Sequence, residues 1–187
     1  MRVPYKQFAR GEYFHLFNHA AGDRLLFADE EDYRRFLTTL KRYCGPDSFS
    51  VIAYCLLPSH FHLLIRQETD TPASTSFYAV SASYSRYFNK KHGFWGSIFR
   101  GKLQHRWIKN SRQLIQTCVY IHRNPQEAGL VERLEDWQWS NYLEWADVRD
   151  GVLFDPEVRK MFFSSAQAYV DCLREYKPRK TSFPDFA

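Results

Sequence analysis

The sequence predicts an α+β sandwich in which helices cover one face of a central antiparallel sheet. Three observations favour this class. Segments typical of strands and of helices follow one another in the order β, α, β, β, α, β. The 187 residues are 44% hydrophobic and 18% aromatic, which is enough for a sizeable core without disulfide staples. No apolar run approaches the ~18 residues that a membrane-spanning helix needs.

The first four elements come from the first third of the chain. Residues 12–18 (EYFHLFN) are aromatic and apolar, which predicts a strand. Residues 29–43 predict a helix, because acidic side chains in the first turn complement the helix dipole and an apolar stripe follows them. Residues 49–57 and 60–66 are two β-rich runs separated only by Pro58-Ser59, so they predict an antiparallel hairpin.

The remaining elements alternate in the same way. Residues 74–92 have a helical period with an aromatic stripe, and a strand is predicted at 104–108, after a glycine-containing loop. Ser111 is predicted to cap a further helix. Beyond the WQWSNY segment at residues 137–142 the pattern is helical and mixed, and the tail from residue 177 is predicted to be loose.

This order of elements is the signature of a ferredoxin-like, or RRM-like, sandwich. Helices on one face of the sheet leave the other face open to a ligand. We therefore predict a main domain at residues 1–145 with an open binding face, followed by a C-terminal helical extension and loose tail at 146–187.

The positive charge of the chain is concentrated in one stretch. Overall there are 26 basic and 21 acidic residues, yet residues 71–126 contain nine basic residues and no acidic one. The rest of the chain is left with 17 basic and 21 acidic residues. The nine are Arg86, Lys90, Lys91, Arg100, Lys102, Arg106, Lys109, Arg112 and Arg123. An acid-free block of this length favours a polyanion partner such as nucleic acid, although solvated helix faces also collect basic residues.

Cysteine usage and the first residues indicate the compartment. The four cysteines, Cys44, Cys55, Cys118 and Cys172, form no C-x-x-C pair, which is typical of reduced thiols in the cytosol. The first twenty residues carry several charges where a secretion signal would be apolar. We therefore expect a cytoplasmic protein.

Two histidines on the strand at 60–66 are the first candidates for chemistry. Side chains alternate along a strand, so His60 and His62 share one face while Phe61, Leu63 and Ile65 take the other. Two imidazoles at this spacing can hold a divalent metal if a third ligand comes from elsewhere. Alone, the same spacing also fits two partly exposed histidines without a function.

The helix that begins at Ser111 carries a second candidate. Tyr120 lies on its polar side, and Asn124 falls one turn further on, so that its carbonyl oxygen could lie next to the phenol. Pro125 disfavours the helical conformation of Asn124 and places the pair in the last turn. A helix tyrosine that packs through its ring and hydrogen bonds through its hydroxyl is the alternative.

Four motifs in order resemble those of a known family. The segment LPSHFHLLI (57–65) resembles the HUH motif, two histidines around a hydrophobic residue. VYIHRNPQEAGLV (119–131) resembles the Tyr-Ile-His-x-Asn-Pro-x-x-Ala-Gly-Leu-Val segment of the REP-associated tyrosine transposases, which are HUH single-tyrosine transposases. FWGSIFRGKLQ (94–104) and WQWSNY (137–142) match further stretches of that group. The resemblance spans about residues 11–142.

The resemblance implies an enzyme that cuts and rejoins single-stranded DNA. It implies that residues 1–145 are the catalytic domain, that Tyr120 attacks a phosphodiester to give a 5′-phosphotyrosine intermediate, and that His60 and His62 hold a divalent metal. Asn124 stands where related transposases carry a third ligand. The implied metal is Mg²⁺ or Mn²⁺, although imidazoles also accept Zn²⁺, Ni²⁺ or Co²⁺. The implied partner is a DNA hairpin of the repeated extragenic palindrome (REP) type, with no membrane and no small-molecule substrate, and the enzyme is expected to act as a monomer or homodimer.

The resemblance also gives the basic block a role. We predict DNA contacts from Arg86, Lys90, Arg100, Lys102, Arg106, Lys109, Arg112 and Arg123. Phe94, Trp95, Phe99 and Trp107 are candidates either for stacking on unpaired bases or for the core. The other histidines fall into two groups: His105 and His122 are expected to be structural or phosphate-facing, and His15, His19 and His92 receive no role.

Two alternatives remain open at this point. A non-catalytic module on an RRM-like sheet would bind single-stranded nucleic acid, but it needs aromatic side chains on the central strands, where this chain has His60 and His62. A relaxase-like replication initiator has similar chemistry but usually a longer chain and further histidine ligands.

Overall fold

The structure, a computed structural model, describes residues 9–176. The predicted tail from residue 177 and the first eight residues lie outside the described part. Within it, helices and strands follow one another as β1 (Tyr13–His19), α1 (Glu30–Tyr43), β2 (Phe49–Leu57), β3 (His60–Gln67), α2 (Ala73–His92), β4 (Gln104–Ile108), α3 (Ser111–Glu127), the 3₁₀ turn η1 (Leu134–Asp136), α4 (Tyr142–Trp145), α5 (Pro156–Lys160) and α6 (Ala166–Glu175).

The four strands form one antiparallel sheet in the order β2-β3-β1-β4. The tight turn at Pro58-Ser59 joins β2 to β3, as the sequence predicts, and β1 inserts between β3 and β4. In this register His19 lies opposite His60, and Arg106 lies opposite His15. The central position of β1 matters for the site, because it brings the histidines of β1 beside those of β3.

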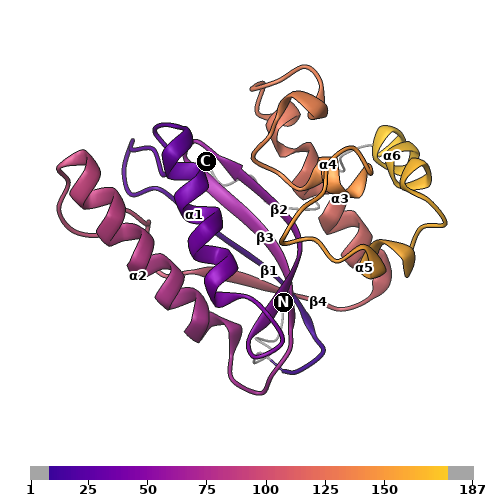
Figure 1. The fold of residues 1–187 in the computed structure, drawn as a ribbon, viewed down its shortest axis with the longest axis horizontal. Coiled ribbons are helices and arrows are strands. Elements are labelled where there is room, and N and C mark those ends of the chain that lie inside the picture. Colours follow the sequence, from indigo (N-terminus) through magenta and orange to yellow (C-terminus); the bar gives the residue numbers. More distant parts are fainter. Residues whose placement is uncertain (1–8, 177–187) are drawn as a thin grey trace, which may run out of the picture.

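The first helical layer packs on one face of the sheet (Figure 1). Phe36 and Leu40 of α1 and Phe77, Val80 and Tyr84 of α2 are buried in a core with the inward side chains of the strands. Asp29 begins α1 with a capping box, in which its side chain accepts from the amide of Asp32 and the Asp32 carboxylate accepts from the Asp29 amide. The α+β class and the predicted order of elements are confirmed.

The second face of the sheet is partly covered by α3, although the sequence predicts that this face is open. Leu114, Cys118 and Ile121 form an apolar stripe on α3, and they are buried against side chains of β2 and β3. An amphipathic helix has to bury such a stripe, and the bare sheet offers the nearest apolar surface. The helix thereby brings its other side chains over the middle of the sheet.

The beginning of α3 also differs from the prediction. Asn110, and not Ser111, is the N-cap, because its extended backbone lets its side-chain oxygen accept from the amide of Gln113 at 2.9 Å. The helix passes through Pro125 and ends at Glu127, so Asn124 does lie in the last turn.

The C-terminal helices pack against α3 and the edge of β2 (Figure 1). A β-bulge between Val51 and Ala53 interrupts the pairing with β3, and the carbonyl of Ile52 at this bulge accepts from the side chains of Asn141 and Trp145, each at 3.0 Å. Trp145 of α4 and Tyr169 of α6 are fully buried in the same cluster. The boundary at residue 145 stays a prediction. Across residues 9–176, none of the helices has the length and apolar character to cross a bilayer.

Candidate active site

The two predicted histidines lie on one face of β3, as the alternation requires. The rings of His60 and His62 have their centroids 5.1 Å apart. Phe61, Leu63 and Ile65 point to the opposite side, into the core beneath α1 and α2. His62 is buried and His60 is partly buried, so both imidazoles are held in place by the strand and its neighbours.

Two further histidines from β1, His15 and His19, join them, although neither was predicted to have a role. His19 stacks on His60 with ring centroids 4.8 Å apart. His15 lies beside His62, and their Nε2 and Nδ1 atoms are 3.0 Å apart, within hydrogen-bond distance. The signal was present in the sequence as histidines at i and i+4 on one strand, which share a face. This spacing indicates a cluster with His60 and His62 only when β1 is known to pair with β3.

The tyrosine predicted as nucleophile meets this histidine cluster. The ring of Tyr120, on α3, lies 5.4 Å from the ring of His62 and 6.1 Å from the ring of His15, in edge-on geometry in both cases. Tyr120 is partly buried. Three elements that are far apart in the sequence, β1, β3 and α3, therefore place a phenol beside a cluster of imidazoles.

Asn124 is almost buried and its amide is oriented by the helix. Its Nδ2 atom donates to the backbone carbonyl of Tyr120 at 2.8 Å. The hydrogen bond fixes the nitrogen end of the amide on the helix backbone, and the oxygen end is the one left to bind a cation. This geometry is compatible with the predicted ligand role, which remains a prediction.

Burial keeps the imidazoles of the cluster neutral. Desolvation, followed by the charge of Arg106, lowers the pKa of His15 to about 3. Desolvation and then the neighbouring His19 lower the pKa of His60 to about 4, and His62 is shifted in the same direction, mainly by desolvation. Neutral imidazoles have a free lone pair, which is the form that binds a metal.

Arg106 is a positive charge that acts on His15 and His62 of this cluster. It lies opposite His15 on β4, and its guanidinium carbon is 5.8 Å above the ring of Phe17 on β1. Desolvation lowers the pKa of Arg106, and the interaction with Tyr120 acts in the opposite direction. A permanent cation thus lies beside the histidines and interacts with Tyr120, where it would stabilise a phosphate or a phenolate.

Comparisons with known proteins bear on this arrangement. No family model matches the chain. A Haemophilus influenzae protein assigned as a REP-associated tyrosine transposase is 28% identical over 126 residues, which covers 59% of this chain and 69% of that protein. A solved structure, that of a REP-associated tyrosine transposase bound to a REP hairpin, matches with a TM-score of 0.62 over 83% of this chain and 98% of its own, at 18% identity.

The chain is similar to the REP-associated tyrosine transposases. The first relative supports the similarity in sequence, and the solved structure supports it in fold. The resemblance predicted from the four motifs is therefore confirmed, and the names of these two relatives support an enzyme of the transposase kind.

The similarity to these transposases implies a divalent metal, and the histidine pair fits one. The Nδ1 atom of His62 is engaged by His15, and the Nδ1 atom of His60 lies 3.1 Å from the hydroxyl of Ser59. Such contacts orient a ring and leave Nε2 as the ligand atom. Within residues 9–176, no group of three His, Cys, Asp or Glu ligand atoms that includes His60 and His62 has the spacing of a metal site.

A different trio, Asp29, Asp32 and His92, has the spacing of a metal site in the described residues. The ammonium of Lys91 already lies 2.7 Å from Asp29 and 3.2 Å from Asp32. The same carboxylates also cap α1. A lysine thus supplies the positive charge that these acids need, and we assign the trio a structural role.

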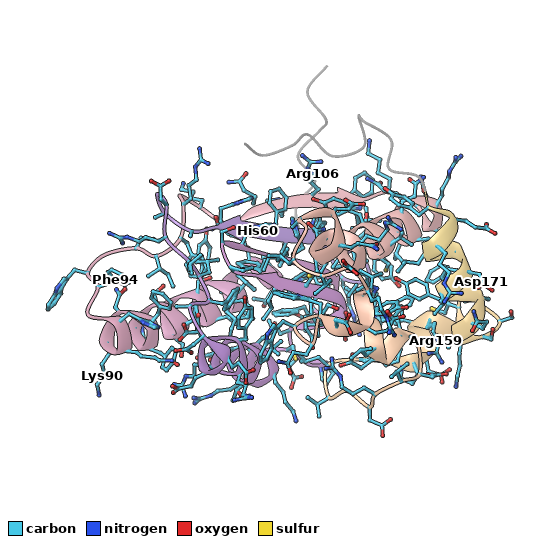
Figure 2. All side chains as sticks on the ribbon, turned by 90° about the horizontal axis from the view of Figure 1, so that it is seen from above. His60, Lys90, Phe94, Arg106, Arg159 and Asp171 are labelled. Atoms are coloured by element: carbon cyan, nitrogen blue, oxygen red, sulfur yellow. The ribbon has the colours of Figure 1, made fainter. Side chains whose placement is uncertain are left out.

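The basic residues predicted to bind DNA lie on two sides of the molecule. Figure 2 shows Arg106 on the side of the histidines and Lys90 across the sheet, on α2. Arg100 precedes β4, and its charge adds to the effect of desolvation in lowering the pKa of His19. Arg86 lies with Lys90 on the exposed side of α2. Exposed Lys102, Lys109 and Arg112 lie in the segments before and after β4.

Arg123 is more constrained than the other basic residues. It donates to the carbonyl of Leu173 on α6 at 3.1 Å and forms an ion pair with Glu127 at 3.4 Å. The predicted DNA contact therefore competes with a structural contact to the C-terminal helices.

The aromatic candidates divide between core and surface. Phe99 is buried, and Trp107 packs against the core while its indole donates to Glu12 at 2.7 Å. Trp95 is 90% exposed, and Phe94 beside it is partly exposed. Of the four, only these two remain candidates for stacking on bases.

Proposed function

We propose that this protein is a single-stranded DNA strand transferase that cleaves and rejoins DNA near hairpins of the REP type. Tyr120 is the nucleophile, and His60 and His62 hold a divalent metal. The observation that carries the proposal is the contact between the ring of Tyr120 and the ring of His62, whose centroids are 5.4 Å apart although the two residues are separated by about a third of the chain. A tyrosine that served only to pack α3 would not need to meet an HUH histidine.

The reaction is a pair of transesterifications. The phenol oxygen of Tyr120 attacks the phosphorus, an O–P bond forms, and the bond from phosphorus to the 3′ oxygen breaks. The phenol loses its proton, and the departing oxygen takes one up to become a 3′-hydroxyl. A DNA hydroxyl then attacks the 5′-phosphotyrosine and returns the phenol, so that strands are rejoined without ATP.

Several residues would assist this reaction. A phenol has a pKa near 10, so its attack at neutral pH requires stabilisation of negative charge. Arg106 supplies a permanent positive charge beside the tyrosine. A bound Mg²⁺ or Mn²⁺ would polarise the phosphate. Asn124 is the candidate for a third ligand. Its amide nitrogen donates to the carbonyl of Tyr120, so the amide oxygen is the atom that would bind the metal.

The DNA partner is inferred from charge and from the relative that binds a REP hairpin. Arg106 lies on the side of the sheet that carries the histidines, the charge of Arg100 acts on His19, and the exposed Lys109 follows directly after β4. A phosphate backbone that passes over Tyr120 would meet these side chains. Arg86 and Lys90 lie across the sheet and would contact only DNA that extends around the molecule.

The test is covalent capture of labelled DNA. Hairpin DNA with single-stranded flanks is incubated with the protein and Mn²⁺, and adducts are separated on a denaturing gel. We expect an adduct with the wild type and with Tyr78→Phe, a matched control for an exposed tyrosine on α2, and none with Tyr120→Phe. If wild type and Tyr120→Phe both bind the hairpin and neither forms an adduct with any hairpin, the non-catalytic binding module becomes the better account.

A further inference from the structure

His15, on the central strand β1, makes a close polar contact with a predicted metal ligand. Its Nε2 atom lies 3.0 Å from Nδ1 of His62, and both rings are buried. Phe17, two residues further along β1, packs beside both rings, at 5.0 Å from His15 and 6.0 Å from His62. The contact therefore has a fixed geometry in a dry environment, where a hydrogen bond has a strong effect on the tautomer of each ring.

Metal binding by His62 determines which of the two rings must donate this hydrogen bond. A hydrogen bond between two neutral imidazoles uses one N–H and one lone pair. If His15 donates, His62 carries its own proton on Nε2 and cannot bind a metal through that atom. If His62 donates from Nδ1, its Nε2 atom keeps a lone pair.

We propose that His15 is a positioning residue that accepts a hydrogen bond from His62 Nδ1–H and so holds His62 in the tautomer that presents Nε2 to the metal. The inference rests on the proposed function, because it takes His62 as a metal ligand. His15 itself touches neither metal nor DNA in this account. Its role is to orient the ring of His62 and to raise the basicity of the ligand atom.

The neighbours of His15 hold its ring in place. Arg106 lies opposite it on β4, and the ring of Tyr120 lies against it from α3. In this position Nε2 of His15 lies 3.0 Å from Nδ1 of His62, where it can accept a hydrogen bond.

The proposal predicts a specific pattern of metal affinities. We expect His15→Leu, which keeps an apolar side chain but removes the acceptor, to weaken Mn²⁺ binding by about 10- to 100-fold. His15→Gln should recover most of the affinity, because its amide oxygen can take the place of Nε2. Mn²⁺ binding to the full chain, measured by electron paramagnetic resonance without DNA, is a readout that does not depend on catalysis.

Nitrogen NMR of the metal-free protein tests the tautomers directly. We expect His15 and His62 both to be protonated on Nδ1. A proton on Nε2 of His62 would overturn the proposal. Hairpin binding without metal and the far-ultraviolet circular dichroism spectrum check that each variant is folded, and His15→Gln provides a second, milder variant if His15→Leu fails this check.

His62→Ala separates this inference from the proposed function. If His62→Ala loses Mn²⁺ affinity and His15→Leu binds as the wild type does, the positioning role is wrong and the metal site stands. If His62→Ala binds Mn²⁺ as the wild type does, the metal site of the proposed function is wrong, and the role of His15 falls with it.

Discussion

His122 gives the sharpest prediction about stability, because it is buried on the same helix as Tyr120. Its Nδ1 atom lies 2.5 Å from the hydroxyl of Tyr169 on α6, and its Nε2 atom lies 2.9 Å from Oδ1 of Asn141. Its ring neighbours are Tyr142, Trp145 and Tyr169, which bear no charge at neutral pH. Desolvation lowers the pKa of His122 from its ordinary 6.5 to about 4, against a smaller opposite effect of Asn141.

The direction of the pH effect follows from this shift. Between pH 6.5 and 4 an unfolded His122 binds a proton and the folded one does not, so acid favours the unfolded chain. Each pH unit in this window is worth about 1.4 kcal/mol per histidine. From pH 7 to pH 5, His122 alone lowers the free energy of unfolding by about 2 kcal/mol. The loss continues to grow below pH 5 and levels off below about pH 4, where the folded His122 is also protonated.

The variant His122→Gln isolates this contribution. His15, His60 and His62 also have lowered pKa values and steepen the pH dependence of the wild type, but the variant retains them. We expect the free energy of unfolding of His122→Gln, measured by urea denaturation at pH 7 and pH 5, to fall by about 2 kcal/mol less than that of the wild type. Equal losses in the two proteins would refute a neutral, buried His122.

Three further predictions concern the site and its DNA. His60→Ala should abolish Mn²⁺-dependent adduct formation and leave metal-free hairpin binding intact; an undiminished adduct would remove His60 as a ligand. Lys109→Gln should weaken hairpin binding and reduce the slope of log affinity against log salt by about 1, whereas Arg123→Gln should change that slope less because Arg123 is held by Leu173; equal slopes in all three proteins would move the interface elsewhere. Trp95→Ala should weaken binding of single-stranded flanks by about 1–3 kcal/mol if the exposed indole stacks on a base, and titration with single-stranded DNA would show an unchanged affinity if it does not.

Much of the fold could be predicted because short-range patterns decide it. The capping box of α1, the tight turn at Pro58-Ser59 and the alternation on β3 each act within a few residues. These patterns predicted every strand within a residue or two and placed His60 and His62 on one face. The contact of α3 with the second face was not predicted, because its apolar stripe could have been buried in several ways.

The candidate site was predicted only in part, for a similar reason. Tyr120, His60 and His62 could be found from motifs, and Asn124 from helix spacing. His15 and His19 depend on pairing between strands about 45 residues apart, which a single sequence does not specify. The basic block is continuous in the sequence, but α2 and β4 lie on opposite sides of the core, so Lys90 and Arg106 are separated by the sheet.

The identity of the nucleophile is tested most directly by finding which residue carries the DNA. Trypsin should release residues 113–123 as a peptide in which Tyr120 is the single tyrosine. After reaction of the wild-type protein with hairpin DNA and nuclease trimming, we expect mass spectrometry to find a nucleotide phosphate on Tyr120 in this peptide. A nucleotide attached to any other residue, with residues 113–123 unmodified, would contradict the role of Tyr120 as nucleophile.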